Sequence, residues 1–334
     1  MKKIIILLFF SLGIFAHGQP MFSHEGEIQG KENYNFHEFT FMNSMDDVRL
    51  YGTLITPKTS FQKIVIIVAG SGKDTRHAHY KLATSLLENN IAVYRFDERG
   101  VGTSEGQYTS SLEKLTEDIS YCIRHLKSET EFKSKRIGFL GHSLGGMAAA
   151  TATVASHNSR TPVDFLIQIA SPVKNFSYAS KHQIHTLPHN SIPKKSIKQT
   201  VALLDTLVTI TTTNKHLSNA TIRNKGLSAI EKRNFNLEDI KFWSLSHISL
   251  YKKDCEPMYK ALEVPTIFII GDEDQLVNPS DETRFLKRYN NPFITVKEMA
   301  HLNHYLTVGT LESNAIYAID RRATKTIIDW LQQI

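Results

Sequence analysis

Residues 136–156 read RIGFLGHSLGGMAAATATVAS, and this stretch decides the fold class. An apolar, β-branched run ends at Gly141, and an alanine-rich run begins at Leu144. This pattern predicts a buried strand, a sharp turn at Ser143 and then a helix. So tight a turn needs small flanking residues, which accounts for Gly141 and Gly145. The G-x-S-x-G spacing in this setting is typical of an exposed serine nucleophile, because N–H groups at the helix start favour a developing anion.

Short apolar runs alternate with helical patterns on both sides of this turn. Further strands are predicted at 63–69, 91–97, 164–170, 265–270 and 293–298, and further helices at 79–89, 112–126 and 313–333. Such alternation predicts an α/β fold with a mostly parallel sheet covered by helices on both faces. Two earlier strands, 35–43 and 48–56, are joined by a turn too short for a crossover, so we expect them to be antiparallel.

About ninety residues, 172–263, interrupt this alternation. They carry helical patterns, for example over 200–210, together with polar stretches. A loop of that length without secondary structure would be unusual in a compact domain. We therefore expect a helical insertion, or lid, between two strands of the sheet.

The first eighteen residues have the layout of a secretory signal peptide. A basic start, Met1-Lys2-Lys3, precedes an apolar run over 4–15 and the small residues of Ala16-His17-Gly18. The apolar run is shorter than the roughly 20 residues that span a bilayer. We expect residues 1–18 to be removed and a mature chain, 19–334, to be exported to the periplasm or the medium without a stable membrane span. A retained membrane anchor is the alternative.

Composition excludes several classes of partner and of protein. The 334 residues are 41% hydrophobic, and 39 basic against 33 acidic residues leave a net charge of only +6, so we expect no nucleic-acid partner. Two cysteines are too few for a disulfide scaffold or a multi-cysteine zinc domain. Export permits a disulfide between Cys122 and Cys255, but two separate buried thiols fit the sequence equally well.

A serine nucleophile needs a base and a group that orients the base. In this type of fold the chain order is serine, acid, histidine. The predicted strand 265–270 is followed by an acidic loop that contains Asp272, Glu273 and Asp274, and the last strand is followed by His301 and His304. Catalytic groups lie beyond the carboxyl ends of parallel strands, so both loops are well placed.

Four further segments resemble motifs of the α/β-hydrolase superfamily. They are VAGSG at 68–72, DERGVGTS at 97–104, G-x-x-D-x-x-V at 271–277 and LNH at 302–304. The chain is most similar to secreted bacterial carboxylesterase-like serine hydrolases, which are grouped near dienelactone hydrolases and prolyl-oligopeptidase-type domains. The resemblance implies the α/β-hydrolase fold and hydrolysis of a small-molecule ester without metal or cofactor.

The resemblance also implies a role for each matching residue. Ser143 would be the nucleophile, His304 its base and Asp274 the acid that orients the base. The backbone N–H groups of Ser71 and Leu144 would form the oxyanion hole. His142, inside the motif, is expected to point away from the nucleophile.

Several alternatives stay open. His301 is a second candidate base, and Asp272 and Glu273 compete with Asp274. A peptidase or amidase could use the same triad, and a non-catalytic binding protein could keep the fold. The charged residues Arg95, Asp97, Glu98 and Arg99 are expected to form structural ion pairs. The oligomeric state is open as well.

Overall fold

The computed structural model describes residues 21–187, 196–236, 240–311 and 316–334. The predicted signal peptide lies outside these residues, so export stays a prediction. Within the described ranges, no helix is both long and apolar enough to cross a bilayer.

The predicted strands form one sheet of eight strands in the order β1-β2-β4-β3-β5-β6-β7-β8, with partly exposed strands β1 and β8 at its two edges. The strands are β1 (Tyr34–Asn43), β2 (Val48–Pro57), β3 (Lys63–Val68), β4 (Ala92–Phe96), β5 (Arg136–His142), β6 (Leu166–Ile169), β7 (Thr266–Gly271) and β8 (Ile294–Met299). β2 pairs antiparallel with β1 and β4, and the other neighbouring pairs are parallel. The predicted parallel sheet with an antiparallel first pair is confirmed.

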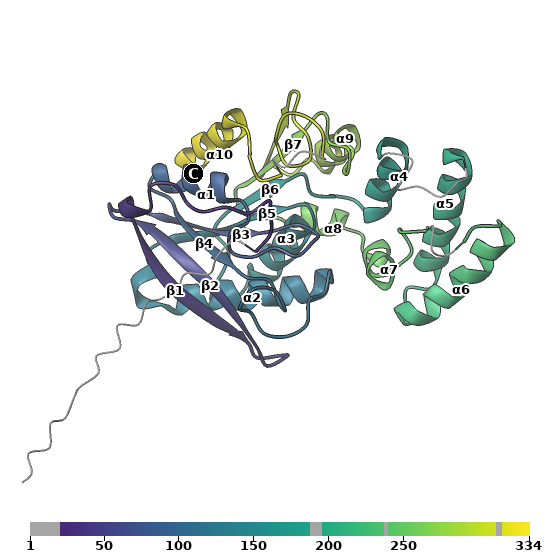
Figure 1. Ribbon diagram of the computed structural model, residues 1–334, viewed down its shortest axis with the longest axis horizontal. Coiled ribbons are helices and arrows are strands. Elements are labelled where there is room, and N and C mark those ends of the chain that lie inside the picture. The colour runs from purple at the N-terminus through teal and green to yellow at the C-terminus, as the bar shows by residue number, and fades with distance from the viewer. Residues whose placement is uncertain (1–20, 188–195, 237–239, 312–315) are drawn as a thin grey trace, which may run out of the picture.

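Helices cover both faces of the sheet, as Figure 1 shows. The helices outside the insertion are α1 (Tyr80–Glu88), α2 (Leu112–Ser128), α3 (Leu144–Ser156), α8 (Glu256–Lys260), α9 (Pro279–Tyr289) and α10 (Arg321–Gln333). α1 and α10 pack together on one face, and α2 and α3 pack together on the other. The strands between them are almost wholly buried, which places the main hydrophobic core on both sides of the central strands.

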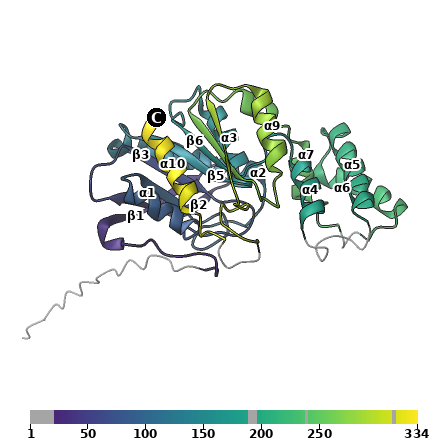
Figure 2. The same ribbon diagram turned by 90° about the horizontal axis from the view of Figure 1, so that it is seen from above.

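Between β6 and β7 the chain forms a helical insertion, which we define as α4 (Phe176–Thr186), α5 (Ile197–Thr213), α6 (Asn219–Lys232) and α7 (Leu245–Lys252). These helices stand beyond one end of the sheet, clearly apart from it in Figures 1 and 2. They bury an apolar cluster of their own around Leu203, Leu207 and Trp243. The insertion therefore has a core of its own, while Ala179 and Leu250 join it to the main core.

The structure corrects the expected start of the last helix and decides between the two alternatives for the cysteines. The last helix begins at Arg321, where Asp320 caps it, rather than near 313, and residues 313–315 lie outside the described ranges. The preceding segment instead buries Tyr317, whose hydroxyl donates to Asp74 at 2.7 Å. Cys122 and Cys255 are both free and buried, so the disulfide alternative does not hold in this structure.

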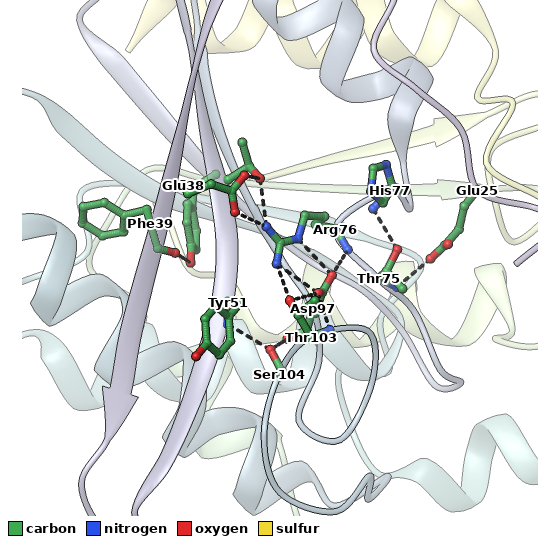
Figure 3. A network of polar contacts seen from close by, with 12 residues as sticks. Glu25, Glu38, Phe39, Tyr51, Thr75, Arg76, His77, Asp97, Thr103 and Ser104 are labelled. Carbon is green, nitrogen blue, oxygen red and sulfur yellow. Dashed lines mark hydrogen bonds and ion pairs between the residues drawn. The ribbon is translucent and has the colours of Figure 1, made fainter. Parts of the chain in front are cut away.

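The turn after β4 is held by a buried ion pair, shown in Figure 3. The guanidinium of Arg76 donates to both carboxylate oxygens of Asp97, at 3.1 and 3.0 Å, and to Glu38 on β1 at 2.6 Å. Asp97 also accepts bonds from the backbone and hydroxyl of Thr103. Burial pushes the pKa of Asp97 upward, but the bonds from Arg76 outweigh it and hold that pKa below its ordinary value.

The structural role predicted for this turn is thus correct for Asp97, and also for Arg99, which pairs with Asp46 and Asp118. The expected ion pair is not formed by two neighbouring residues of the turn, Arg95 and Glu98. Arg95 donates to the backbone carbonyl of Ala78, and Glu98 accepts from the backbone N–H of Asp74, so both bond to main-chain groups instead of opposite charges.

Asp97→Ala should destabilise the protein by about 3–5 kcal/mol, because it leaves the buried guanidinium of Arg76 without its principal partner. Urea denaturation at neutral pH measures the free energy of unfolding. Asp329→Ala is the control, because its pair with Lys325 is exposed and its loss should change stability by less than about 1 kcal/mol. Equal losses in the two variants would contradict this assignment.

Candidate functional site

Ser143 lies in a strained turn between β5 and α3. Its backbone has φ 53° and ψ −118°, which a residue with a side chain rarely adopts. The chain crosses itself closely at this point: a Cβ on Gly145 would lie 2.1 Å from the carbonyl oxygen of Ala69. A Cβ on Gly141 would lie 2.5 Å from the Cα of Gly146. Glycine is therefore required at both flanking positions, as predicted.

Asp274 and His304 form a buried pair beside this turn. Nδ1 of His304 and Oδ2 of Asp274 are 2.8 Å apart, and both side chains are almost fully buried. The other carboxylate oxygen accepts the backbone N–H groups of Leu276 and Val277, at 2.7 and 2.9 Å. The carboxylate is thus fixed from both sides. Its bond to Nδ1 favours the tautomer in which Nε2 carries a free lone pair.

The acid and histidine loops are packed directly against each other. A Cβ on Gly271 would lie 1.9 Å from the carbonyl oxygen of Leu302, and the N–H of Glu273 donates to that same oxygen at 3.0 Å. Asn303 then shapes the histidine loop, because its side-chain oxygen accepts from the backbone N–H groups of Tyr305 and Thr307. Local hydrogen bonds therefore set the position of His304.

A cavity of about 320 Å³ opens between these loops and the insertion. Its lining includes the sequence-predicted residues Ser71, Ser143, Leu144 and His304, and Asp274 lies directly behind His304. The structure thus brings together the predicted nucleophile, base, acid and oxyanion-hole residues. The start of α3 also lies at the cavity, so the positive end of its helix dipole faces the serine.

The alternative candidates lie elsewhere. His301 is exposed and pairs with exposed Glu273 at 3.1 Å, and its backbone N–H donates to Asp272. These three form a separate surface cluster outside the lining of the cavity.

Helix α4 of the insertion is bonded to the acid loop, which the sequence did not reveal. His182 donates to the carbonyl of Asp274 at 2.7 Å, Gln183 to that of Leu276 at 3.0 Å, and Thr186 to that of Gln275 at 2.6 Å. About ninety residues separate these partners, so no local pattern signals the contact. The acid loop is consequently braced by the insertion as well as by the sheet.

His142 lines the same cavity as Ser143 and contacts the histidine loop. Its Nε2 donates to the backbone carbonyl of His304 at 3.1 Å. Burial, together with the nearby histidines His304 and His79, holds the pKa of His142 well below its ordinary value. His142 is therefore neutral near pH 7, and its bond to the histidine loop does not depend on pH in that range.

Glu282 on α9 anchors the chain where it leaves the sheet for the insertion. One of its oxygens accepts the backbone N–H of Val173 at 2.7 Å, and the other is buried without a partner among the described residues. Burial raises the pKa of this carboxyl to about 8, and the nearby charges of Asp281 and Asp274 add to the effect. The group is therefore protonated in the folded protein at neutral pH.

Comparison with known proteins gives a family and a fold. A family model described as serine aminopeptidase, S33, matches residues 59–310. The chain is 28% identical over 144 residues to YfhR, an uncharacterised protein of Salmonella typhimurium, and this match covers 41% of the chain and 48% of YfhR. The chain thus spans about half the length of the curated relatives it matches.

Solved structures share the fold at low sequence identity. An esterase from Pyrococcus furiosus aligns with a TM-score of 0.59 at 18% identity, over 92% of this chain and 94% of that one. A dienelactone hydrolase from Anabaena variabilis aligns with a TM-score of 0.52 at 11% identity, over 90% of this chain and 98% of that one. These likenesses concern the fold alone.

Glu282→Gln should make stability less dependent on pH. The folded pKa, about 8, lies above the ordinary 4.5, so the folded wild type keeps a proton that the unfolded chain releases. The free energy of unfolding of the wild type, minus that of the variant, should therefore fall as the pH rises. We expect a slope of up to about 1.4 kcal/mol per pH unit between about pH 5 and 8, and no further fall above that range. Urea denaturation across pH 5–9 measures this difference. Glu298→Gln, exposed on β8, is the control, and parallel curves for Glu282→Gln and wild type would contradict the assignment.

Proposed function

Because the chain belongs to the serine aminopeptidase S33 family of α/β-hydrolases, we propose that it is a serine hydrolase that cleaves carboxylic esters through an acyl-enzyme. One observation carries the proposal. The buried Asp274–His304 pair, with its atoms 2.8 Å apart, opens on the same cavity as the strained serine at the β5–α3 turn. This is the set of groups that acyl transfer through serine requires.

In the proposed mechanism, Nε2 of His304 takes the hydroxyl proton of Ser143 as the oxygen attacks the ester carbonyl. Asp274 holds the imidazole orientation and stabilises the imidazolium that forms. His304 then gives the proton to the departing alcohol. Water, activated by the same imidazole, releases the acid from the acyl-enzyme.

The developing oxyanion would be bound by the backbone N–H groups of Leu144 and Ser71. Leu144 is the first residue of α3, so its N–H has no partner within the helix and points along the helix dipole. Ser71 follows β3 and lines the same cavity. Preorganised donors of this kind supply a large share of catalysis in acyl transfer.

Peptide or amide hydrolysis is the second candidate, and the family's description as serine aminopeptidase favours it. Amides have the poorer leaving group but use the same triad. An ester and an anilide with the same acyl group separate the two candidates, and we expect a much larger kcat/KM for the ester.

The first experiment is hydrolysis of 4-nitrophenyl esters from acetate to laurate. Ser143→Ala and His304→Ala should each lower kcat by roughly 10³-fold or more, because the members of a triad act as one unit. His301→Ala is the matched control and should stay near wild type. Activity that survives in Ser143→Ala would overturn the proposed nucleophile. Absence of turnover, with no labelling of Ser143 by a fluorophosphonate probe, would instead favour a non-catalytic protein.

His142 should act as a positioning residue for the base. His142→Phe removes the donor to the His304 carbonyl and should lower kcat about 10-fold, with KM within about twofold, because a buried acceptor loses its partner. His142→Gln, which keeps an N–H donor, should recover part of the loss. A change in KM alone would contradict this role.

A further inference from the structure

The cavity beside Ser143 has a mixed lining, to which the helical insertion adds the apolar residues Phe176 and Leu250 as well as polar ones. Apolar side chains of Leu144, Leu276 and Val277 lie near the serine turn and the acid loop. The helical insertion contributes the polar groups Gln183, Ser244, Ser246 and His247 to the same lining. A pocket for plain hydrocarbon chains gains nothing from such groups, since polar atoms there stay unpaired when an alkyl chain binds.

Gln183 presents a free acceptor. Its amide nitrogen donates to the carbonyl of Leu276 at 3.0 Å, which assigns the amide oxygen to the opposite side. In the described part of the chain, this oxygen has no hydrogen-bond partner, and the residue is only half-buried on the cavity wall. The oxygen can therefore receive a proton donor from a bound molecule.

His247 presents a second free group. Its Nδ1 is 2.8 Å from the hydroxyl oxygen of Ser244. Its ring packs against the rings of Phe176 and Tyr251, with the ring centroids 5.9 and 6.0 Å apart. These contacts hold the imidazole, while its Nε2 has no hydrogen-bond partner among the described residues. Burial lowers the pKa of His247, so the ring is neutral and Nε2 donates or accepts according to the tautomer.

A hydroxyl can pair with either group, because it donates to the Gln183 oxygen, and it accepts from or donates to Nε2 of His247 according to the tautomer. We propose that the substrate carries a hydroxyl group on the part of the ester that lies under the insertion, and that Gln183, His247 or both recognise it. This inference rests on the proposed esterase function. The two residues would set specificity without touching the reacting atoms.

Matched esters test the proposal. In the acyl arm, 4-nitrophenyl 6-hydroxyhexanoate is compared with 4-nitrophenyl heptanoate, in which a methyl replaces the hydroxyl. In the alcohol arm, 6-hydroxyhexyl acetate is compared with heptyl acetate by titration of the released acid. We expect kcat/KM to favour the hydroxylated member about 3- to 10-fold in one arm, the effect of one or two neutral hydrogen bonds. That arm identifies which side of the ester lies under the insertion.

The variant His247→Phe keeps an aromatic ring but removes the hydrogen-bonding nitrogens, and Gln183→Met removes the amide oxygen. At least one of the two variants should bring this preference close to one. His216→Phe places the same substitution at an exposed position of the insertion and should leave the preference unchanged. A preference that survives in both His247→Phe and Gln183→Met would overturn the assignment.

The outcomes also separate this inference from the function on which it rests. Hydrolysis of the alkyl esters without any preference for a hydroxyl would overturn the inference and leave the esterase intact. Failure to cleave any ester would overturn the proposed function, and the inference with it.

Discussion

The close crossing of the chain at Ser143 is the constraint on which the rest of this structure depends. β5 and α3 meet at a positive φ of 53°, and the carbonyl of Ala69 lies where a side chain at Gly145 would stand. That contact also draws the loop after β3 against the start of α3. The serine, the first N–H of the helix and the Ser71 loop therefore share one small space. A residue with a side chain at either flanking glycine would have to push these segments apart.

The second group of constraints is formed by backbone bonds between loops that are far apart in sequence. The loops after β7 and β8 touch through Gly271 and Leu302, and this contact aligns the carboxylate with the imidazole. Helix α4 bonds to three successive carbonyls of the acid loop, and His142 bonds to the histidine loop. The insertion therefore belongs to the site physically, because it braces the acid loop and contributes side chains to the lining of the cavity. Its own apolar core gives it the stiffness to do so.

Much of the fold could be predicted from local patterns in the sequence. Continuous β-branched runs identified the parallel strands, and the turn of only four residues between β1 and β2 implied their antiparallel pairing. Other features had no local signal. The last helix starts at Arg321 because the segment before it is used to bury Tyr317 against Asp74. Arg76, the partner of Asp97, comes from another loop and not from the charged turn itself. Glu282 on α9 is buried and bonded to Val173, more than a hundred residues away in the chain.

By itself the sequence determined the α/β class, the turn at Ser143 and the short set of candidates for acid and base. Each of these depends on neighbours in the chain: strand and helix periods, glycines at a tight turn, and polar residues directly after a strand. The tertiary structure alone decided which candidates meet. It buried Asp274 with His304, left His301 and Glu273 exposed, and placed Gln183 and His247 on the cavity wall. The physical reason is that burial and hydrogen bonding depend on which segments pack together, and those segments lie tens to hundreds of residues apart.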